Sequence, residues 1–494
     1  MNIDVAMFRG KRTSLLFMIT FVAGLLLLRF GQEIVNAPPS PILWHVATGA
    51  IAPLFLAMFF SALGNILVAG TAVAAGAYWL FQRGADRLSL VLYAIAALVS
   101  LHYLHISPND TYTNDLGGHI SYINSIHLHW FDPYSYAGYE SHHPPLYYYV
   151  AAIVSGLAEK ITRTDIHTAM RFLSWLCFLV FNAFSLLTMR RAGLSPAAYK
   201  IGVTLLLLWP ASMHLASKIN SEALYYALYA IAFYYAICWY QEGKSRQLLS
   251  ALLWAGVAFM VRSNAIILFA VIFSFMIIAR YRKRFYFKSL LCRRWAFVGF
   301  ALLACTVVDM GHALRFGVSA AAIINKFGVG TGTPLYFGHL FLLNYDYTLD
   351  HPFHDWTVAQ SFLAVLLKTA IFGEYTWPWP QLAVLLDVLL YAMGFYALLP
   401  WLFARRKEWQ GMLPFMLGFA IPVTAAMINA AWKQAQVSQD ARFIYPAMLC
   451  FVVCFCRSYE LVKNRGALVL TYVAPVMAVS FTLLSVYFFW NNAR

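Results

Sequence analysis

Acidic residues and histidines are concentrated in one loop, residues 107–143, of a chain that is 62% hydrophobic and only 11% charged. A carboxylate in such a loop can accept a proton from a hydroxyl or an amine, and an acid beside a histidine can bind a divalent metal. Because ionisable groups at a membrane boundary are costly, their concentration indicates chemistry at the membrane face. These residues are Asp110, Asp115, His119, His127, His129, Asp132, Glu140, His142 and His143.

Asp115 is the leading candidate for a catalytic residue among the acids of this loop. Asp115, His119 and Tyr122 are spaced i, i+4 and i+7, so on a short helix they would share one face. His119 and Tyr122 would then contact the substrate beside the acid. The simpler alternative is that Asp115 caps a helix or is solvated. Asp110 lies in a more flexible context and is the weaker candidate.

Glu140 is the second candidate acid, and two prolines and three tyrosines follow it closely. Proline is tolerated in a first helical turn, and tyrosine suits the headgroup layer of a membrane. The adjacent His142 and His143 could bind substrate or, with an acid, a divalent metal, so the metal requirement stays open. We interpret His127 and His129 as solvated or hydrogen-bonded, because no pair of histidines fits a zinc-protease spacing.

Polar and cationic residues recur at three expected helix ends that face the same side of the membrane. Lys218, Asn220 and Glu222 lie in KINSEALYY, Arg262 lies in RSN, and Arg442 lies in QDARFIYP. Separate cations facing one side can bind a phosphate or pyrophosphate through charge-assisted hydrogen bonds. The alternative is that these side chains extend to lipid headgroups. Arg262 and Arg442 favour phosphate binding, because positive charge is otherwise scarce on that side.

A second polar segment, residues 313–380, mixes glycines and aromatic residues with acids and histidines. Such a mixture suits a sugar-binding surface or a lid, and a lipid interface would suit it equally. No Lys-Ser/Thr ending follows the glycines, so ATP binding is not indicated.

The mean hydropathy of +0.66 and repeated apolar runs of about 20 residues predict an all-α polytopic membrane protein. The net charge is +15, but the basic residues lie in short gaps between apolar runs, which assigns those gaps to the cytoplasm. No soluble domain or basic aromatic groove accompanies this charge, so a nucleic-acid partner is excluded. The seven cysteines lie in or beside apolar runs, and we expect them to pack in the core.

Because each basic gap is assigned to the cytoplasm, the chain must cross the membrane an even number of times between any two of these gaps. This condition predicts thirteen membrane spans, with the N-terminus inside and the C-terminus outside. Residues 42–81 cross an odd number of times, and one long or broken helix fits best. The short apolar stretches 144–158 and 358–372 are expected to lie along the interface. The expected spans are 14–30, one within 42–81, 88–105, 169–190, 199–217, 222–240, 247–262, 263–279, 294–312, 381–404, 412–432, 442–460 and 467–490.

Several short motifs resemble, in order, those of membrane glycosyltransferases with the GT-C fold that use polyprenyl-phosphate sugars. The protein O-mannosyltransferases and aminoarabinose transferases belong to this group. The resemblance spans roughly residues 88–450. The motifs are DxxxHxxY from Asp115, ExxxPPLYY from Glu140, NxE from Asn220, the RSN break at Arg262, FGEY at 372–375 and QxxRFxxP from Gln439.

The resemblance implies a GT-C-type helical bundle and an inverting sugar transfer. It implies that Asp115 is the base or a metal partner, that Glu140 is the second acid, and that Arg442 contacts the lipid phosphate. Glu374, in the FGEY motif, becomes a further substrate-binding candidate. The core is expected over 88–460, with outer segments 106–168, 313–380 and 433–441.

Residues 1–87 are expected to form an N-terminal transmembrane extension, and 461–494 a C-terminal transmembrane helix. Oligosaccharyltransferases carry a large C-terminal soluble domain that this sequence lacks, so we expect a lipid or glycan acceptor rather than a protein sequon. The resulting hypothesis is a glycosyltransferase of the bacterial inner membrane whose active site faces outward. The alternative is a transporter or flippase of lipid-linked glycans, which should place polar residues near the middle of the membrane.

Overall fold

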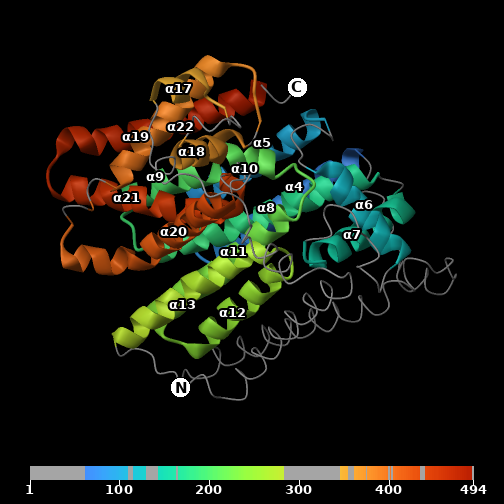
Figure 1. Ribbon diagram of the computed structural model, residues 1–494, viewed down its shortest axis with the longest axis horizontal. Coiled ribbons are helices and arrows are strands. Elements are labelled where there is room, and N and C mark those ends of the chain that lie inside the picture. The colour runs from blue at the N-terminus through green and yellow to red at the C-terminus, as the bar shows by residue number, and fades with distance from the viewer. Residues whose placement is uncertain are drawn as a thin grey trace. The chain divides into compact units, whose positions relative to one another are not determined.

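Every element in the described part of the chain is a helix (Figure 1). The computed structural model describes residues 62–108, 115–129, 143–162, 165–282, 345–353, 361–373, 375–398, 401, 404–433 and 440–491. The helices are α4 (Ala62–Gln82), α5 (Arg87–Ile106), α6 (Leu116–Leu128), α7 (Leu146–Thr162), α8 (Ile166–Arg191), α9 (Pro196–Leu207), α10 (Pro210–Leu215), α11 (Glu222–Glu242), α12 (Ser245–Phe259), η2 (Ser263–Ala265), α13 (Ile266–Tyr281), α17 (Tyr345–Asp350), α18 (Phe362–Phe372), α19 (Pro380–Leu398), α20 (Arg406–Lys433), η6 (Ala441–Ala447), α21 (Met448–Asn464) and α22 (Leu468–Asn491).

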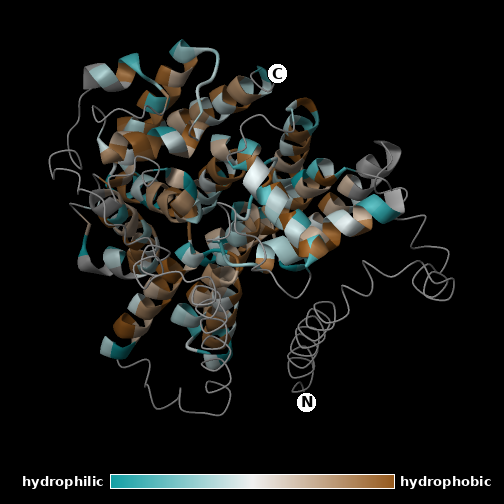
Figure 2. Cartoon of the chain, turned by 45° about the vertical axis from the view of Figure 1, so that its right-hand side comes forward, coloured by the Kyte–Doolittle hydropathy of each residue, from teal (hydrophilic) through white to brown (hydrophobic). Residues whose placement is uncertain are grey.

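Eight of the described helical segments are long and apolar enough to cross a membrane. Hydrophobic residues, brown in Figure 2, predominate along them. The protein is therefore an integral membrane protein, and the expected all-helical fold class is confirmed. These segments are Arg87–Ile106, Ile166–Arg191, Glu222–Glu242, Ser263–Tyr281, Pro380–Leu398, Gly411–Ala430, Ala441–Asn464 and Leu468–Asn491.

Two of the expected spans differ from the structure. Residues 199–217 do not form one helix, because α9 ends at Leu207 and α10 begins at Pro210. Proline lacks the N–H that would continue the hydrogen-bond ladder of the preceding helix. The expected span 247–262 corresponds to α12, which has 15 residues and is short for a crossing.

The expected count of thirteen spans is not confirmed. The expected spans 14–30 and 294–312 lie outside the described residues, as does most of 42–81. The short helix α18, with 11 residues, occupies the stretch that was expected not to cross.

The structure divides into two compact units. Of the residues that the structure describes, the first unit contains 62–69, 117–129, 145–162 and 165–170, and the second unit contains the rest. Within the first unit, α6 and α7 pack through aromatic side chains, because the ring of Tyr122 stacks on that of Tyr148 at 3.9 Å.

In the second unit, α11 and α21 are central helices. Of the most apolar window of each, 83% is buried, against 33% for the windows of α5 and α22. A helix that is buried on all sides belongs in the interior of a bundle, whereas half-exposed apolar helices suit a lipid boundary. Helices α12 and α13 lie side by side next to α11 (Figure 1).

Small residues allow the helices of this core to approach one another closely. A Cβ added at Gly418 of α20 would lie 2.7 Å from the Cys450 sulfur and 2.9 Å from the Phe233 ring. Helices in membranes commonly approach one another at such small residues. The packing fixes α11, which begins with Glu222, and α21, which continues from the η6 segment that carries Arg442.

Candidate functional site

Two arginines share one buried carboxylate in the second unit. Arg262 Nη1 donates a hydrogen bond to Glu222 Oε1 at 2.6 Å, and Arg442 Nε lies 3.6 Å from the same oxygen. The Arg442 Nε also lies 3.1 Å from Asp440 Oδ2. The side chains of Glu222, Arg262 and Arg442 are only 4%, 9% and 12% exposed. The structure thus brings together three of the residues expected at different helix ends.

Three helical segments begin at this cluster. Glu222 is the first residue of α11, Arg262 immediately precedes η2, and Asp440 caps η6 by accepting the Arg442 N–H at 2.8 Å. The first turn of a helix leaves backbone N–H groups without intrahelical partners and carries the positive end of the helix dipole. The cluster therefore combines guanidinium groups with several positive helix ends. It also confirms that these ends lie on the same side of the bundle.

Asn220 fixes the conformation of Glu222 through local hydrogen bonds. Its Nδ2 donates to Glu222 Oε2 at 2.9 Å, and its Oδ1 accepts the Glu222 N–H at 3.2 Å. This pair explains the spacing of the NxE motif. One oxygen of Glu222 is held by Asn220, and the other faces the two arginines. Asn220 therefore serves the cluster by orienting its shared carboxylate.

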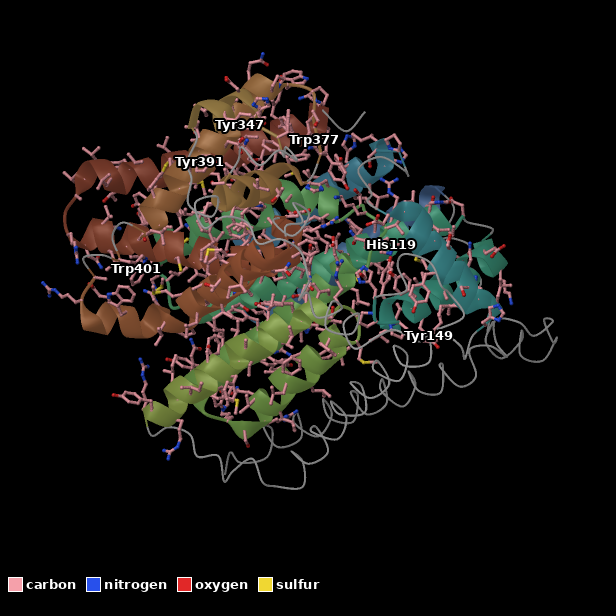
Figure 3. The ribbon with its side chains drawn as sticks, in the orientation of Figure 1. His119, Tyr149, Tyr347, Trp377, Tyr391 and Trp401 are labelled. Atoms are coloured by element: carbon pink, nitrogen blue, oxygen red, sulfur yellow. The ribbon has the colours of Figure 1, made fainter. Side chains whose placement is uncertain are left out.

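Lys218 lies against Tyr375, the last residue of the FGEY motif. Its Nζ donates to the Tyr375 hydroxyl at 3.0 Å and lies 4.2 Å from the ring centroid. Gly373 allows the chain to turn here with a φ of +66°, and a Cβ at this position would lie 3.1 Å from the His214 ring. Trp377, which is labelled in Figure 3, anchors the same segment, because its ring packs on that of Phe489 with the centroids 4.9 Å apart. The motif thus positions a tyrosine beside a buried cation.

The short helix α18 supports the turn that carries Arg442. Thr369 Oγ1 accepts the Ala441 N–H at 2.8 Å, and Tyr226 donates its hydroxyl to the Arg442 carbonyl at 2.6 Å. Buried backbone groups at the start of η6 therefore have partners from two other helices. These bonds hold the Arg442 guanidinium close to Glu222.

Asp115 precedes α6 rather than forming part of it. Its φ is +56°, in the left-handed region, and its side chain is exposed. The expectation that Asp115, His119 and Tyr122 share one helical face is therefore wrong for Asp115. Asp115 makes no hydrogen bond or ion pair with another described residue, and its catalytic role stays a prediction.

His119 and Tyr122 are both buried within the first unit. His119 is labelled in Figure 3. Its Nδ1 and the Tyr148 hydroxyl lie 2.9 Å apart, and the rings of these two residues stack. Tyr122 stacks on the same Tyr148 ring. These contacts place both residues in the packing of α6 against α7. Their role as substrate contacts stays a prediction.

Three site candidates, Glu140, His142 and Glu374, lie outside the described residues. His143 lies in the second unit just before Pro144, and it is half-buried. Within the described part of the chain, no three His, Cys, Asp or Glu side chains are grouped as metal ligands. The metal requirement of the expected site therefore stays open.

Sequence reasoning missed two buried cations of the second unit, Arg171 of α8 and Lys368 of α18. Arg171, near the start of α8, is 5% exposed and donates to the backbone of Ser107 and Ser217. The scarcity of positive charge that pointed to Arg262 and Arg442 applies equally to Arg171, because it lies at the start of an expected span. That signal could have identified it.

Residues 142–309 match the family model described as dolichyl-phosphate-mannose-protein mannosyltransferase. The matched range contains Lys218, Glu222 and Arg262 but ends before Arg442. This match covers about a third of the chain and confirms the family resemblance seen in the sequence motifs.

The oligosaccharyltransferase of Archaeoglobus fulgidus, solved in the apo form, is similar in structure, with a TM-score of 0.46 and 16% sequence identity. The likeness covers 82% of this chain and 55% of that chain, so this chain spans about half the length of that solved relative. No curated protein matches the chain in sequence.

Proposed function

We propose that this chain is a membrane glycosyltransferase that moves a sugar from a polyprenyl-phosphate donor to a lipid or glycan acceptor at the outer face of the membrane. The observation that carries the proposal is the buried cluster in which Arg262 and Arg442 share the carboxylate of Glu222. The family match over residues 142–309 supports the same class of reaction.

The charges of the cluster suit an anionic ligand. Within the cluster, the two positive charges of Arg262 and Arg442 face the two negative charges of Glu222 and Asp440. Lys218, in the segment that leads into Glu222, adds a further positive charge beside Tyr375. The two guanidinium groups, this lysine and the positive helix ends favour a phosphate group. A polyprenyl phosphate would bind here with its apolar tail between the helices.

The reaction follows from this placement of charge. The acceptor oxygen attacks C1 of the sugar, the bond between C1 and the phosphate oxygen breaks, and the electron pair leaves with the phosphate. Arg262, Arg442 and Lys218 stabilise the charge that builds on the leaving phosphate. Asp115 accepts the proton of the acceptor hydroxyl, with Glu140 as the second acid of the loop. Attack opposite the leaving group inverts the configuration at C1.

The proposed membrane is the inner membrane of a bacterium, and the active site faces outward. The basic gaps between spans support this orientation, because Lys and Arg are enriched in cytoplasmic loops. No separate energy source is required, since the lipid-linked donor is already activated.

The direct test uses the purified protein in nanodiscs, given an undecaprenyl-phosphate sugar and an envelope lipid extract. We expect undecaprenyl phosphate to be released only when both the donor and an acceptor are present. Mass spectrometry should identify an acceptor heavier by one sugar, and NMR should report an inverted anomeric centre. The Arg262→Gln variant should release little product, whereas Arg191→Gln, a change at the far end of α8, should match wild type.

A second experiment compares envelope lipids and glycans from a deletion strain and its parent. The loss of one sugar mass from a lipid or glycan would identify the acceptor. A loss confined to proteins would replace the proposed acceptor with a protein. An unchanged envelope, together with no donor cleavage in nanodiscs, would contradict the proposal.

One observation favours the alternative of a transporter or flippase. Asp387 of α19 and Lys368 of α18 are 1% and 0% exposed and interact electrostatically. Ionisable residues inside membrane segments commonly mark transport pathways. Vesicles that carry the purified protein separate the two functions, because a flippase would move the lipid-linked glycan across the bilayer without cleaving it.

A further inference from the structure

Three side chains on one face of α8 donate hydrogen bonds to two other parts of the second unit. Arg171, Ser174 and Trp175 are spaced i, i+3 and i+4, so they share that face. Arg171 donates from Nε to the Ser217 carbonyl at 2.9 Å and from Nη1 to the Ser107 carbonyl at 3.0 Å. Its Nη2 also donates to Ser107 Oγ at 2.5 Å. One guanidinium therefore joins two separate segments.

The neighbouring side chains reinforce both connections. Ser174 donates its hydroxyl to the Lys218 carbonyl at 2.5 Å, next to the carbonyl that Arg171 holds. Trp175 donates its indole N–H to the Ala97 carbonyl and to Ser100 Oγ, each at 3.1 Å. The face of α8 thus holds α5 on one side and residues 217–218 on the other.

Each of the two segments leads to a part of the proposed site. Ser107 caps the C-terminal end of α5, and Asp115 follows it eight residues later in the sequence. Ser217 and Lys218 lead into α11, whose first residue is Glu222. Arg171 is thus hydrogen-bonded to Ser107, which precedes Asp115 in the chain, and to Ser217, which precedes Lys218 and Glu222.

Arginine suits this position for two physical reasons. The carbonyl groups at the C-terminal end of α5 lack helical partners and carry the negative end of the helix dipole, which attracts a cation. The planar guanidinium can also donate in fixed directions to two segments at once, whereas a lysine ammonium acts as a point charge.

We propose that Arg171 is a positioning residue that sets the distance between Asp115 and the Lys218–Glu222 segment. The inference rests on the proposed function, because it assigns the acceptor base to one segment and the phosphate contacts to the other. Arg171 acts through the backbone of both segments. Its loss should therefore misplace the base relative to the phosphate while leaving the phosphate contacts intact.

The test compares Arg171→Lys and Arg171→Gln with Arg191→Lys, a matched change at the other end of α8. Arg191 pairs with Glu242 at 2.5 Å, away from the cluster, so its variant should keep wild-type kinetics. A misplacement of about 1 Å can cost roughly 100-fold in rate, so we expect kcat of both Arg171 variants to fall about 10- to 100-fold. The KM for the undecaprenyl-phosphate sugar and the affinity for undecaprenyl phosphate should stay within about threefold of wild type, since the contacts of the phosphate remain.

Two results would overturn the inference. Arg171→Lys and Arg171→Gln with wild-type kcat would show that Arg171 does not set the geometry. A higher KM for the donor with unchanged kcat would instead assign Arg171 to donor binding. Activity is expressed per folded protein, from the monodisperse fraction in size-exclusion chromatography, so that a lower yield is not read as a lower rate.

Ser107→Ala provides a second variant if the Arg171 variants fail to fold. It removes the Nη2 acceptor and leaves the Ser107 carbonyl in place, so we expect a smaller fall in kcat with the same unchanged donor affinity. Wild-type kcat in Ser107→Ala would count against the inference. If the wild-type protein itself transfers no sugar, the proposed function fails, and that result is distinct from a wild-type rate in these variants.

Discussion

Glu222 and Arg262 form an ion pair of 2.6 Å although they lie 40 residues apart in the chain and belong to separate helical segments. Both side chains are less than one-tenth exposed. Such a pair is costly to bury unless each group has further partners. Here Glu222 also accepts from Asn220 and lies near Arg442, so the pair forms part of a larger network.

Glu222→Gln should strongly destabilise the protein. The change keeps the shape of the side chain but leaves two buried guanidinium groups without their shared carboxylate. Breaking a buried pair in this way costs about 3–5 kcal/mol. Thermal unfolding in detergent, followed by intrinsic tryptophan fluorescence, measures the loss.

Glu242→Gln is the matched control, at the other end of the same helix. Its carboxylate pairs with Arg191 and Lys244 at the surface, where such pairs contribute about 0–1 kcal/mol. Equal thermal-unfolding midpoints for Glu222→Gln and Glu242→Gln would mean that the ion pair of Glu222 with Arg262 does not hold the helices together.

Asp115→Asn should abolish sugar transfer and leave stability nearly unchanged. The φ of +56° at this position favours Asp or Asn over other side chains, so Asn keeps the backbone conformation. Asn cannot take the acceptor proton. Transfer is measured with a polyprenyl-phosphate sugar, and stability by thermal unfolding.

Asp115→Ala separates the two effects, because it loses the carboxylate and also adds strain of about 1 kcal/mol. We therefore expect both variants to be inactive and only the alanine variant to unfold earlier. A fully active Asp115→Asn protein would remove Asp115 from the mechanism and direct attention to Asp110.

The spans and the cations were predictable from sequence for simple physical reasons. A membrane demands long apolar helices, so hydropathy alone predicts segments such as Ser263–Tyr281. Positive charge is scarce at helix ends that are expected to face outward, and this made Arg262 and Arg442 conspicuous. The sequence did not predict that Glu222 pairs with both, because these contacts join distant segments of the chain.

Local backbone geometry limited the prediction elsewhere. The spacing of Asp115 and His119 fits a helix, but the left-handed φ at Asp115 starts the helix one residue later. Arg171 was missed because it lies inside an apolar run, whose composition predicts a membrane span. Its partners are backbone carbonyls, which no sequence motif reveals.

The segment that carries Tyr375 is predicted to face outward, and cysteine labelling tests this. Thr376 is exposed in that segment, and the five described native cysteines are all buried. A single cysteine at Thr376, in a background without native cysteines, should react with a membrane-impermeant thiol reagent in intact spheroplasts. Thr164, which lies outside the described residues, is expected to behave in the same way.

Asn464→Cys is the inward control, at the exposed last residue of α21. It should react only after lysis, because the basic gap there is assigned to the cytoplasm. The reverse pattern would place the cation cluster on the cytoplasmic side.

Arg442→Ala should severely reduce transfer, and Arg442→Lys should reduce it partially. A guanidinium can bind two phosphate oxygens at once, and this matters most as charge builds on the leaving group. Removing one such electrostatic donor costs about 2–4 kcal/mol of transition-state stabilisation. The lysine variant keeps the charge but loses the planar fork. Steady-state kinetics with a defined polyprenyl-phosphate donor measure the transfer rates of the two variants.

The matched control for Arg442→Lys is Arg457→Lys, at the other end of the segment formed by η6 and α21. Arg457 pairs with Glu460 at 2.7 Å, away from the cluster, so its variant should transfer sugar at the wild-type rate. An arginine that merely extends to lipid headgroups would leave both Arg442 variants nearly as active as wild type. Unimpaired transfer by Arg442→Ala would therefore remove this residue from the phosphate site, and Arg262 with Lys218 would have to bind the phosphate alone.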